Sequence, residues 1–168
     1  GKVLTDQRMQ VLRALIEKKE GSSVTVITTM DAFLDGLPHP GELRAARICA
    51  AGGDVMDLTE FEGRLASMGY ERESQIEGPG QFAVRGGIVD VFPLTEELPV
   101  RIELWGDEID SIRSFDVESQ RSVENLSEIT IYPASENWAD GLKTVSFLEY
   151  FPKDKTLLFL DEPHRLQE

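Results

Sequence analysis

The clearest structural pattern in this chain is Val100-Arg101-Ile102-Glu103-Leu104-Trp105, which Gly106-Asp107 follows directly. Apolar and polar residues alternate along it, as in a β-strand with one buried face. The Gly-Asp pair predicts a turn into a second strand over residues 108–115. Because successive side chains of a strand point to opposite faces, the three apolar residues are expected in the core. The opposite face would carry Arg101, Glu103 and Trp105.

Strands and turns continue on both sides of this hairpin. Gly78-Pro79-Gly80 predicts a tight turn, and residues 81–93 are strand-like, with Gly86-Gly87 indicating a bulge or a close backbone approach. Residues 129–132 predict one more strand. Short connections of this kind favour an antiparallel arrangement. The expected fold class is α/β, in the α+β sense, with an antiparallel or mixed sheet and helices packed on it.

A helix is predicted to begin near residue 59. Thr59 and Glu62 have the spacing of a capping box, in which each side chain satisfies a backbone N–H of the first turn. Phe61, Leu65 and Met68 recur at helical spacing and line one face, and the glycine that follows is a typical helix end.

The two ends of the chain carry further predicted elements. Helical spacing of apolar residues predicts a helix over residues 6–19. A break rich in glycine and proline at residues 36–41 marks the first domain boundary. The other segments are predicted as a short, well-buried strand at 24–28, strands at 43–51 and 157–160, and short helices at 30–34 and 144–150.

Composition narrows the range of functions. Asp and Glu number 31 against 17 Lys and Arg, which gives a formal net charge of −14. Phosphate binding needs a basic surface, so direct nucleic-acid binding is not expected, and anionic membranes repel an acidic chain. No apolar run approaches the ~20 residues of a membrane-spanning helix. The single cysteine, Cys49, is expected to be a small buried residue, and a reducing, cytoplasmic location is expected.

Catalytic chemistry finds little support in the sequence. The apolar run that ends at Asp161-Glu162 resembles a Walker B strand, but no glycine-rich loop with Lys and Ser or Thr accompanies it. His39 and His164 lie far apart, whereas zinc sites favour closely spaced Cys and His ligands. We therefore expect a chain that is not an enzyme, with no catalytic residues, no cofactor and no metal.

Trp105 points to a function. A tryptophan on the polar face of a strand that also carries Arg101 is unexpected for a solvated sheet, and Trp and Arg are enriched in interaction hot spots. Arg85, in the preceding strand-like segment, joins this face if the two strands pair. The alternative is that Trp105 packs under a loop or covers the aliphatic stems of arginines. The alternation by itself leaves both interpretations open.

Several phrases of the sequence resemble a known family. Residues 81–93, QFAVRGGIVDVFP, resemble the signature of the domain shared by UvrB and the bacterial transcription-repair coupling factors (Mfd). Residues 100–112 continue this signature, and residues 131–134 close it. Residues 115–122, FDVESQRS, resemble the coupling factors rather than UvrB. The resemblance is dense over about residues 43–136.

The resemblance implies a division of the chain. Residues 42–136 would form the UvrA-interaction domain. Residues 1–38 and 144–168 would be parts of a UvrB-like flanking domain, which meet as a small helix-strand remnant. Residues 137–143 would be a linker, engineered or native, that replaces a longer segment of the family and leaves Trp138 without a function. The chain, which starts at Gly rather than Met, is expected to be a piece of a longer protein.

The resemblance also implies a partner. The domain of this family binds UvrA without catalysis, and the matching contact residues are Arg85, Arg101 and Trp105, with Phe often standing where this chain has Trp. In the whole protein the domain would bring UvrA to stalled RNA polymerase in transcription-coupled nucleotide excision repair, beside the rest of an ATP-driven translocase. Two alternatives stay open: the equivalent domain of UvrB, and a fragment of an ATP-dependent motor.

Overall fold

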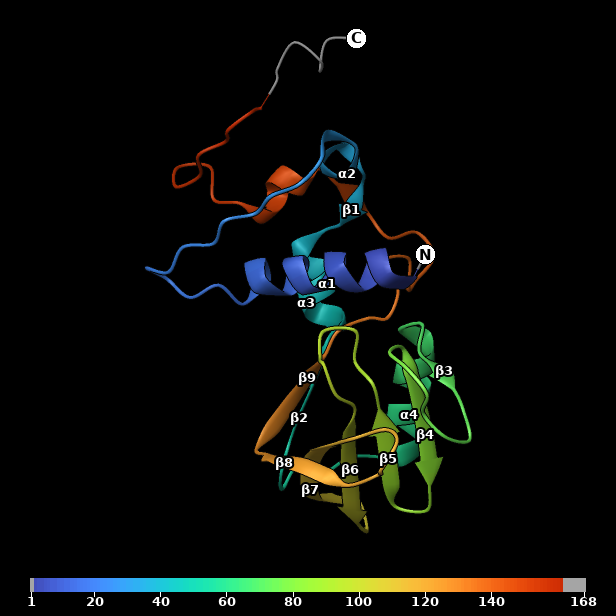
Figure 1. Cartoon of the computed structure of the whole chain (residues 1–168). Coiled ribbons are helices and arrows are strands. Elements are labelled where there is room, and N and C mark those ends of the chain that lie inside the picture. The colour runs from blue at the N-terminus through green and yellow to red at the C-terminus, as the bar shows by residue number, and fades with distance from the viewer. Residues whose placement is uncertain (1, 162–168) are drawn as a thin grey trace.

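Most of the helices lie at one end of the molecule and the main sheet at the other. The computed structural model describes the backbone of residues 2–161 and the side chains from residue 6 onward. Three helices lie together at one end, and a twisted sheet with a fourth helix behind it forms the other end (Figure 1). The chain crosses between the two ends near α3, at the start of β2, and returns at the end of β9.

The main sheet has six strands in the order β3-β4-β5-β6-β7-β8. All neighbours are antiparallel except β3 and β4, which are parallel, so the sheet is mixed and the predicted α+β fold class is confirmed. A separate antiparallel pair joins β2 to β9. The strands are β2 (Ile48–Ala51), β3 (Glu71–Arg72), β4 (Gln81–Arg85), β5 (Ile88–Val91), β6 (Val100–Trp105), β7 (Glu108–Phe115), β8 (Ser122–Leu126) and β9 (Glu128–Ile131).

The register of β5 and β6 separates an apolar face from a polar face. Val89 lies opposite Ile102, and both are fully buried. Their neighbours Asp90 and Arg101 lie opposite each other and therefore point to the other side of the sheet. The alternation predicted for β6 and its hairpin with β7 is confirmed, with a bulge opposite Glu103 and Leu104.

Helix α4 (Leu58–Ser67) covers the apolar face. Phe61, Leu65 and Met68 are buried against the sheet, as predicted. The predicted capping box is wrong, because the N-cap is Asp57, two residues before Thr59. Its side chain accepts a hydrogen bond of 2.8 Å from the backbone N–H of Glu60. A carboxylate at this position accepts a hydrogen bond from a free backbone N–H and is attracted by the positive end of the helix dipole.

Residues 81–93 form two strands rather than one. Gly86-Gly87 is the turn of the β4–β5 hairpin, so the prediction of a bulge within one strand is wrong. Gly86 has a φ of 60°, which favours glycine at the first central position of a two-residue hairpin. The predicted close approach is present, since a Cβ added to Gly87 would lie 3.0 Å from the carbonyl oxygen of Leu104.

The chain ends pack around a second apolar cluster. It contains Met9 and Leu12 of α1, Leu43 of α3, and Tyr132 and Phe147. The elements that build it are α1 (Lys2–Ile16), α2 (Met30–Leu34), α3 (Pro40–Ala46), the antiparallel pair of β1 (Leu37–Pro38) with β10 (Thr144–Val145), and a 3-10 turn over Phe147–Tyr150.

Three predicted elements at the ends therefore need correction. The first helix ends at Ile16 rather than at residue 19. The strand predicted for 43–51 is a helix up to Ala46, because Pro40 fits the first turn and His39 caps it, and only Ile48–Ala51 is extended. The helix predicted for 144–150 is a two-residue strand followed by the 3-10 turn. The helix predicted for residues 30–34 is confirmed as α2.

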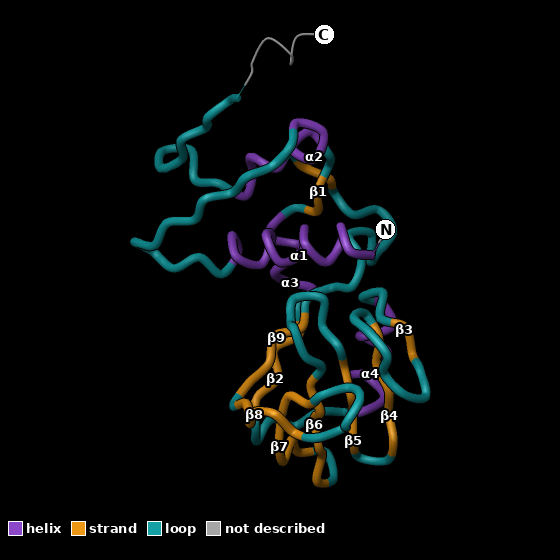
Figure 2. The backbone as a smooth tube through the Cα atoms, viewed as in Figure 1, coloured by secondary structure: helices purple, strands orange, loops and turns teal. Residues whose placement is uncertain are grey.

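Two apolar runs predicted as strands are loops. Residues 24–28 and 157–160 have no strand partner in the described structure and run as loops in Figure 2. Ile27 is 95% exposed and Phe159 is exposed to a similar degree, so the burial predicted for the first run is also wrong. β-branched and apolar composition favours a strand only where a neighbour supplies hydrogen bonds and covers a face. Glu162 and His164 lie outside the described residues.

Two single-residue expectations are also corrected. Cys49 is exposed, because it points away from the core on β2 while its neighbours Ile48 and Ala50 are buried. Trp138, expected to be a linker residue without a role, packs against the second apolar cluster.

Leu65→Ala should lower the free energy of unfolding by about 2–5 kcal/mol, because it leaves a cavity between α4 and the sheet. Leu34→Ala is the matched control, since Leu34 is also helical but exposed, and surface substitutions usually change stability by less than about 0.5 kcal/mol. Chemical denaturation of both variants measures the difference. Equal losses would contradict the assignment of Leu65 to the core.

Candidate protein-interaction site

Trp105 stands at the end of β6, beside the turn at the end of the sheet farthest from α1 (Figure 1). Its side chain is 84% exposed, which excludes packing under a loop. Strand alternation places it on the same side of the sheet as Arg101, away from α4. Tryptophan is among the residue types enriched in interaction hot spots, so this exposed ring makes the face a candidate contact region.

The Asp90 carboxylate joins the two predicted arginines. Its side chain is 5% exposed. Arg101 donates to both of its oxygens, from Nε to Oδ1 at 2.7 Å and from Nη2 to Oδ2 at 2.8 Å. Arg85 donates from Nη2 to Oδ2 at 3.3 Å, and its side chain remains 54% exposed. The structure therefore brings Arg85 and Arg101 together through a shared acid on β5.

Arg101 is held more firmly than Arg85. Its side chain is 13% exposed and its guanidinium lies 4.5 Å from the centre of the Phe115 ring. Its Nη2 also donates to Oε1 of Gln120 at 2.9 Å. The hydrogen bond to Asp90 raises the pKa of Arg101 above its ordinary value. Of the three predicted contact residues, Arg85 and Trp105 are open to a partner, whereas Arg101 is largely engaged within the chain.

The phrase at residues 115–122 builds the loop that supports Arg101. Asp116 Oδ1 accepts hydrogen bonds from the backbone N–H of Ser119 at 2.8 Å and from its hydroxyl at 2.7 Å. Gln120 follows with a φ of 60°, and its side-chain amide donates to the carbonyl of Val117 at 2.7 Å. These bonds aim the amide oxygen of Gln120 at Arg101.

A second ion pair extends the polar face. Arg113 on β7 donates to Oε1 of Glu103 on β6, and the Ser111 hydroxyl donates to the other oxygen of the same carboxylate. On this face three arginines meet the carboxylates of Asp90 and Glu103. Glu108 lies opposite Trp105 and adds a third carboxylate, so these charges balance. The chain as a whole carries −14. The site therefore concentrates arginines on an acidic protein, and an acidic group of a partner would complement the exposed Arg85.

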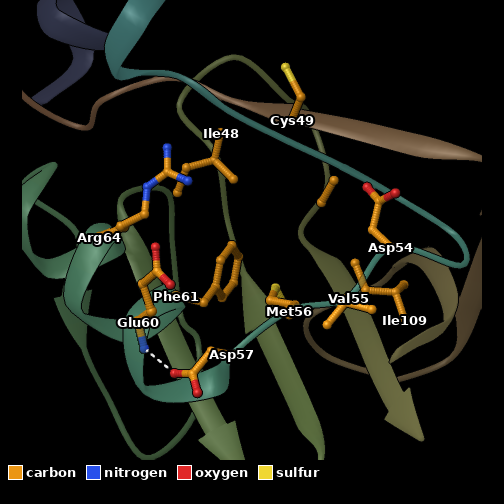
Figure 3. Close-up of a pocket in the computed structure, with 11 residues that line it drawn as sticks. Ile48, Cys49, Asp54, Val55, Met56, Asp57, Glu60, Phe61, Arg64 and Ile109 are labelled. Atoms are coloured by element: carbon orange, nitrogen blue, oxygen red, sulfur yellow. Dashed lines mark hydrogen bonds between the residues drawn. The ribbon is translucent and has the colours of Figure 1, made fainter. Parts of the chain in front are cut away.

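A shallow hollow lies between β2 and α4 (Figure 3). Its volume is about 140 Å³, well below the roughly 300–1,000 Å³ of ordinary ligand sites. Cys49, Asp54 and Arg64 line it, and Asp57 at its rim is occupied as the cap of α4. Within residues 2–161 no cluster of His, Cys, Asp or Glu could hold a metal ion, and no helix is long and apolar enough to cross a membrane.

The sheet that carries the site is the part of the chain that matches a known family. The model of the UvrB interaction domain matches residues 49–137, more than half of the chain. This chain belongs to the UvrB interaction domain family.

Proteins similar to this chain include transcription-repair-coupling factors of several bacteria. The chain is 39% identical over 133 residues to the factor of Bacillus subtilis (strain 168), and 41% identical over 134 residues to that of Staphylococcus haemolyticus (strain JCSC1435). It is 40% identical over 137 residues to that of Staphylococcus aureus (strain bovine RF122 / ET3-1). Each match covers 79% of this chain but 11% of the relative, so the chain spans a small part of these proteins.

Sequence reasoning missed Asp90 and Gln120 as parts of the site. The signal for Asp90 was available, since an acid within the apolar run Ile88–Val91 must either face solvent or find a cation. No local pattern pointed to Gln120, because its contact with Arg101 depends on the loop conformation.

The hydrogen bonds of the loop at 115–122 should be measurable in the titration of Asp116. Hydrogen bonds from the backbone and the hydroxyl of Ser119 lower the pKa of Asp116 below its ordinary value of 3.8. The ionised form therefore favours the fold, an effect present above the ordinary pKa and lost as the pH falls through the lowered one. Ser119→Ala should raise the pKa of Asp116 toward 3.8 in an NMR titration of the carboxyl carbon, whereas Ser122→Ala should leave it unchanged. An Asp116 pKa of 3.8 or above in the unaltered chain would contradict the loop geometry.

Proposed function

We propose that this chain is a non-catalytic module that binds UvrA through the face formed by Arg85, Arg101 and Trp105. The observation that carries the proposal is the combination of an exposed tryptophan with an exposed arginine on the family-matched sheet. Protein-protein hot spots are enriched in these two residue types. A nucleic-acid partner is disfavoured by the charge of −14, because phosphate binding needs an extended basic surface.

Each residue has a distinct role in this proposal. Trp105 supplies apolar contact area, which a partner would cover on binding. Arg85 is exposed enough to pair with an acidic group of UvrA, and the planar guanidinium favours a two-point contact with a carboxylate. Arg101 contributes the part of its guanidinium that its own chain leaves free.

For the whole protein we propose recruitment of UvrA to stalled RNA polymerase in transcription-coupled nucleotide excision repair. The names of the relatives, transcription-repair-coupling factors, support this role over that of the equivalent domain of UvrB. We also propose, from the family resemblance, that a motor lies in the remainder of such a protein, of whose length this chain spans 11%. The cytoplasm is the proposed location.

Calorimetric titration of the chain into UvrA tests the proposal. Trp105→Ala should weaken binding by on the order of 2–4 kcal/mol, because it removes the anchor of the interface. Arg85→Ala should weaken it by about 1–2 kcal/mol and reduce the dependence of the affinity on salt, because one charge pair is lost. Circular dichroism of each variant checks that the fold is retained.

Two substitutions elsewhere serve as matched controls. Phe159→Ala removes an equally exposed aromatic ring from the other end of the chain. Arg72→Ala removes an exposed, ion-paired arginine from the edge strand β3. Both should bind UvrA as the unaltered chain does. Loss of binding in the controls but not in the site variants would place the interface elsewhere, and no binding by the unaltered chain would overturn the proposed partner.

A further inference from the structure

We infer that Asp90 is a positioning residue of this interface, which holds Arg101 in one orientation and tethers Arg85 beside it. This inference rests on the proposed function for its consequence in binding, but its geometry stands on contacts within the chain. Asp90 itself is 5% exposed, too buried to be a main contact for a partner.

The contacts on Arg101 leave one edge of its guanidinium for a partner. Nε and Nη2 donate to Asp90, and Nη2 also donates to Gln120. Nη1 has no hydrogen-bond partner among the described residues. Arg101 has no buried nitrogen without a partner, so the unpaired Nη1 reaches the surface of the protein. An acceptor on UvrA would therefore meet the two N–H groups of Nη1.

Asp90 also controls the net charge and the mobility of Arg85 and Arg101. One carboxylate faces two guanidinium groups, so a positive charge remains for an acidic group of the partner. Arg101, with bonds at 2.7 and 2.8 Å and a ring beneath it, has lost most of its freedom before binding. Ordering a long side chain during association costs affinity, so a pre-oriented arginine binds more tightly than a free one.

Asp90→Asn in the 168-residue chain tests the role. The substitution keeps the shape but removes the charge that holds both arginines. Binding to UvrA should weaken by about tenfold, although Asp90 does not itself meet the partner. Asp154→Asn changes the net charge equally at an exposed site outside the family-matched region, and should bind normally. Unchanged affinity in folded Asp90→Asn would overturn the inference.

A double-mutant cycle separates positioning from general destabilisation. If Asp90 acts through Arg101, adding Asp90→Asn to Arg101→Ala should cost less affinity than adding it to the unaltered chain. Equal costs in both backgrounds would overturn the inference. If Asp90→Asn fails to fold, Asp90→Glu replaces it, since that change keeps the charge but moves the carboxylate relative to Arg101. It should weaken binding by about threefold, and unchanged binding would overturn the inference.

The Nε–H resonance of Arg101 gives a readout that does not depend on UvrA. In the unaltered chain its hydrogen bond to Asp90 should slow exchange with water, and Asp90→Asn should speed that exchange while Asp154→Asn does not. Fast exchange in the unaltered chain would overturn the positioning role. Slow exchange in a chain that does not bind UvrA would overturn the proposed partner alone.

Discussion

The register that pairs Val89 with Ile102 and Asp90 with Arg101 governs both faces of the sheet. Because side chains alternate, a slip of β6 by one residue would send Arg101 into the core and Ile102 to the surface, while Asp90 stayed on the polar face. Burying the guanidinium of Arg101 against α4 without its carboxylate would cost about 3–5 kcal/mol. The apolar core and the polar patch therefore depend on the same alignment of β5 and β6.

A second constraint joins the sheet to the helical end. Tyr132 follows β9, is fully buried, and donates from its hydroxyl to Glu17 at 2.9 Å while accepting from Arg47 at 3.2 Å. The hydroxyl of Tyr70, near the end of α4, donates to the Tyr132 carbonyl at 2.8 Å. Burial raises the pKa of both tyrosines, so both remain protonated donors at neutral pH. This network holds the family-matched sheet against the end of α1 without involving the polar face.

The sequence predicted most of the sheet and little of the chain ends. Strict alternation over residues 100–105 identified the strand and its core face and put Trp105 on the opposite face, because period-two patterning is strong where one face is buried. Alternation left open whether Trp105 is exposed or packs under a loop. The runs at 24–28 and 157–160 have strand composition but lie in loops, since composition cannot tell whether a neighbouring strand is present. The division into domains at 1–38, 42–136, 137–143 and 144–168 stays a prediction.

The candidate site was predictable in its residues but not in its chemistry. Arg85, Arg101 and Trp105 were placed on one face by alternation and by resemblance, and the structure brings the two arginines onto one carboxylate. That Arg101 is mostly engaged by Asp90, Gln120 and Phe115 could not be predicted, because these partners come from strand β5 and from the loop at 115–122, outside the strand of Arg101. The result is an unequal pair, with Arg101 fixed and Arg85 exposed.

Hydrogen-deuterium exchange of the chain with and without UvrA shows directly whether the partner covers the polar face at the ends of β4, β5 and β6. UvrA should slow exchange in peptides spanning residues 84–88 and 103–108, with little change in α1. Protection confined to the helical end, with these two hairpin turns unaffected, would contradict it.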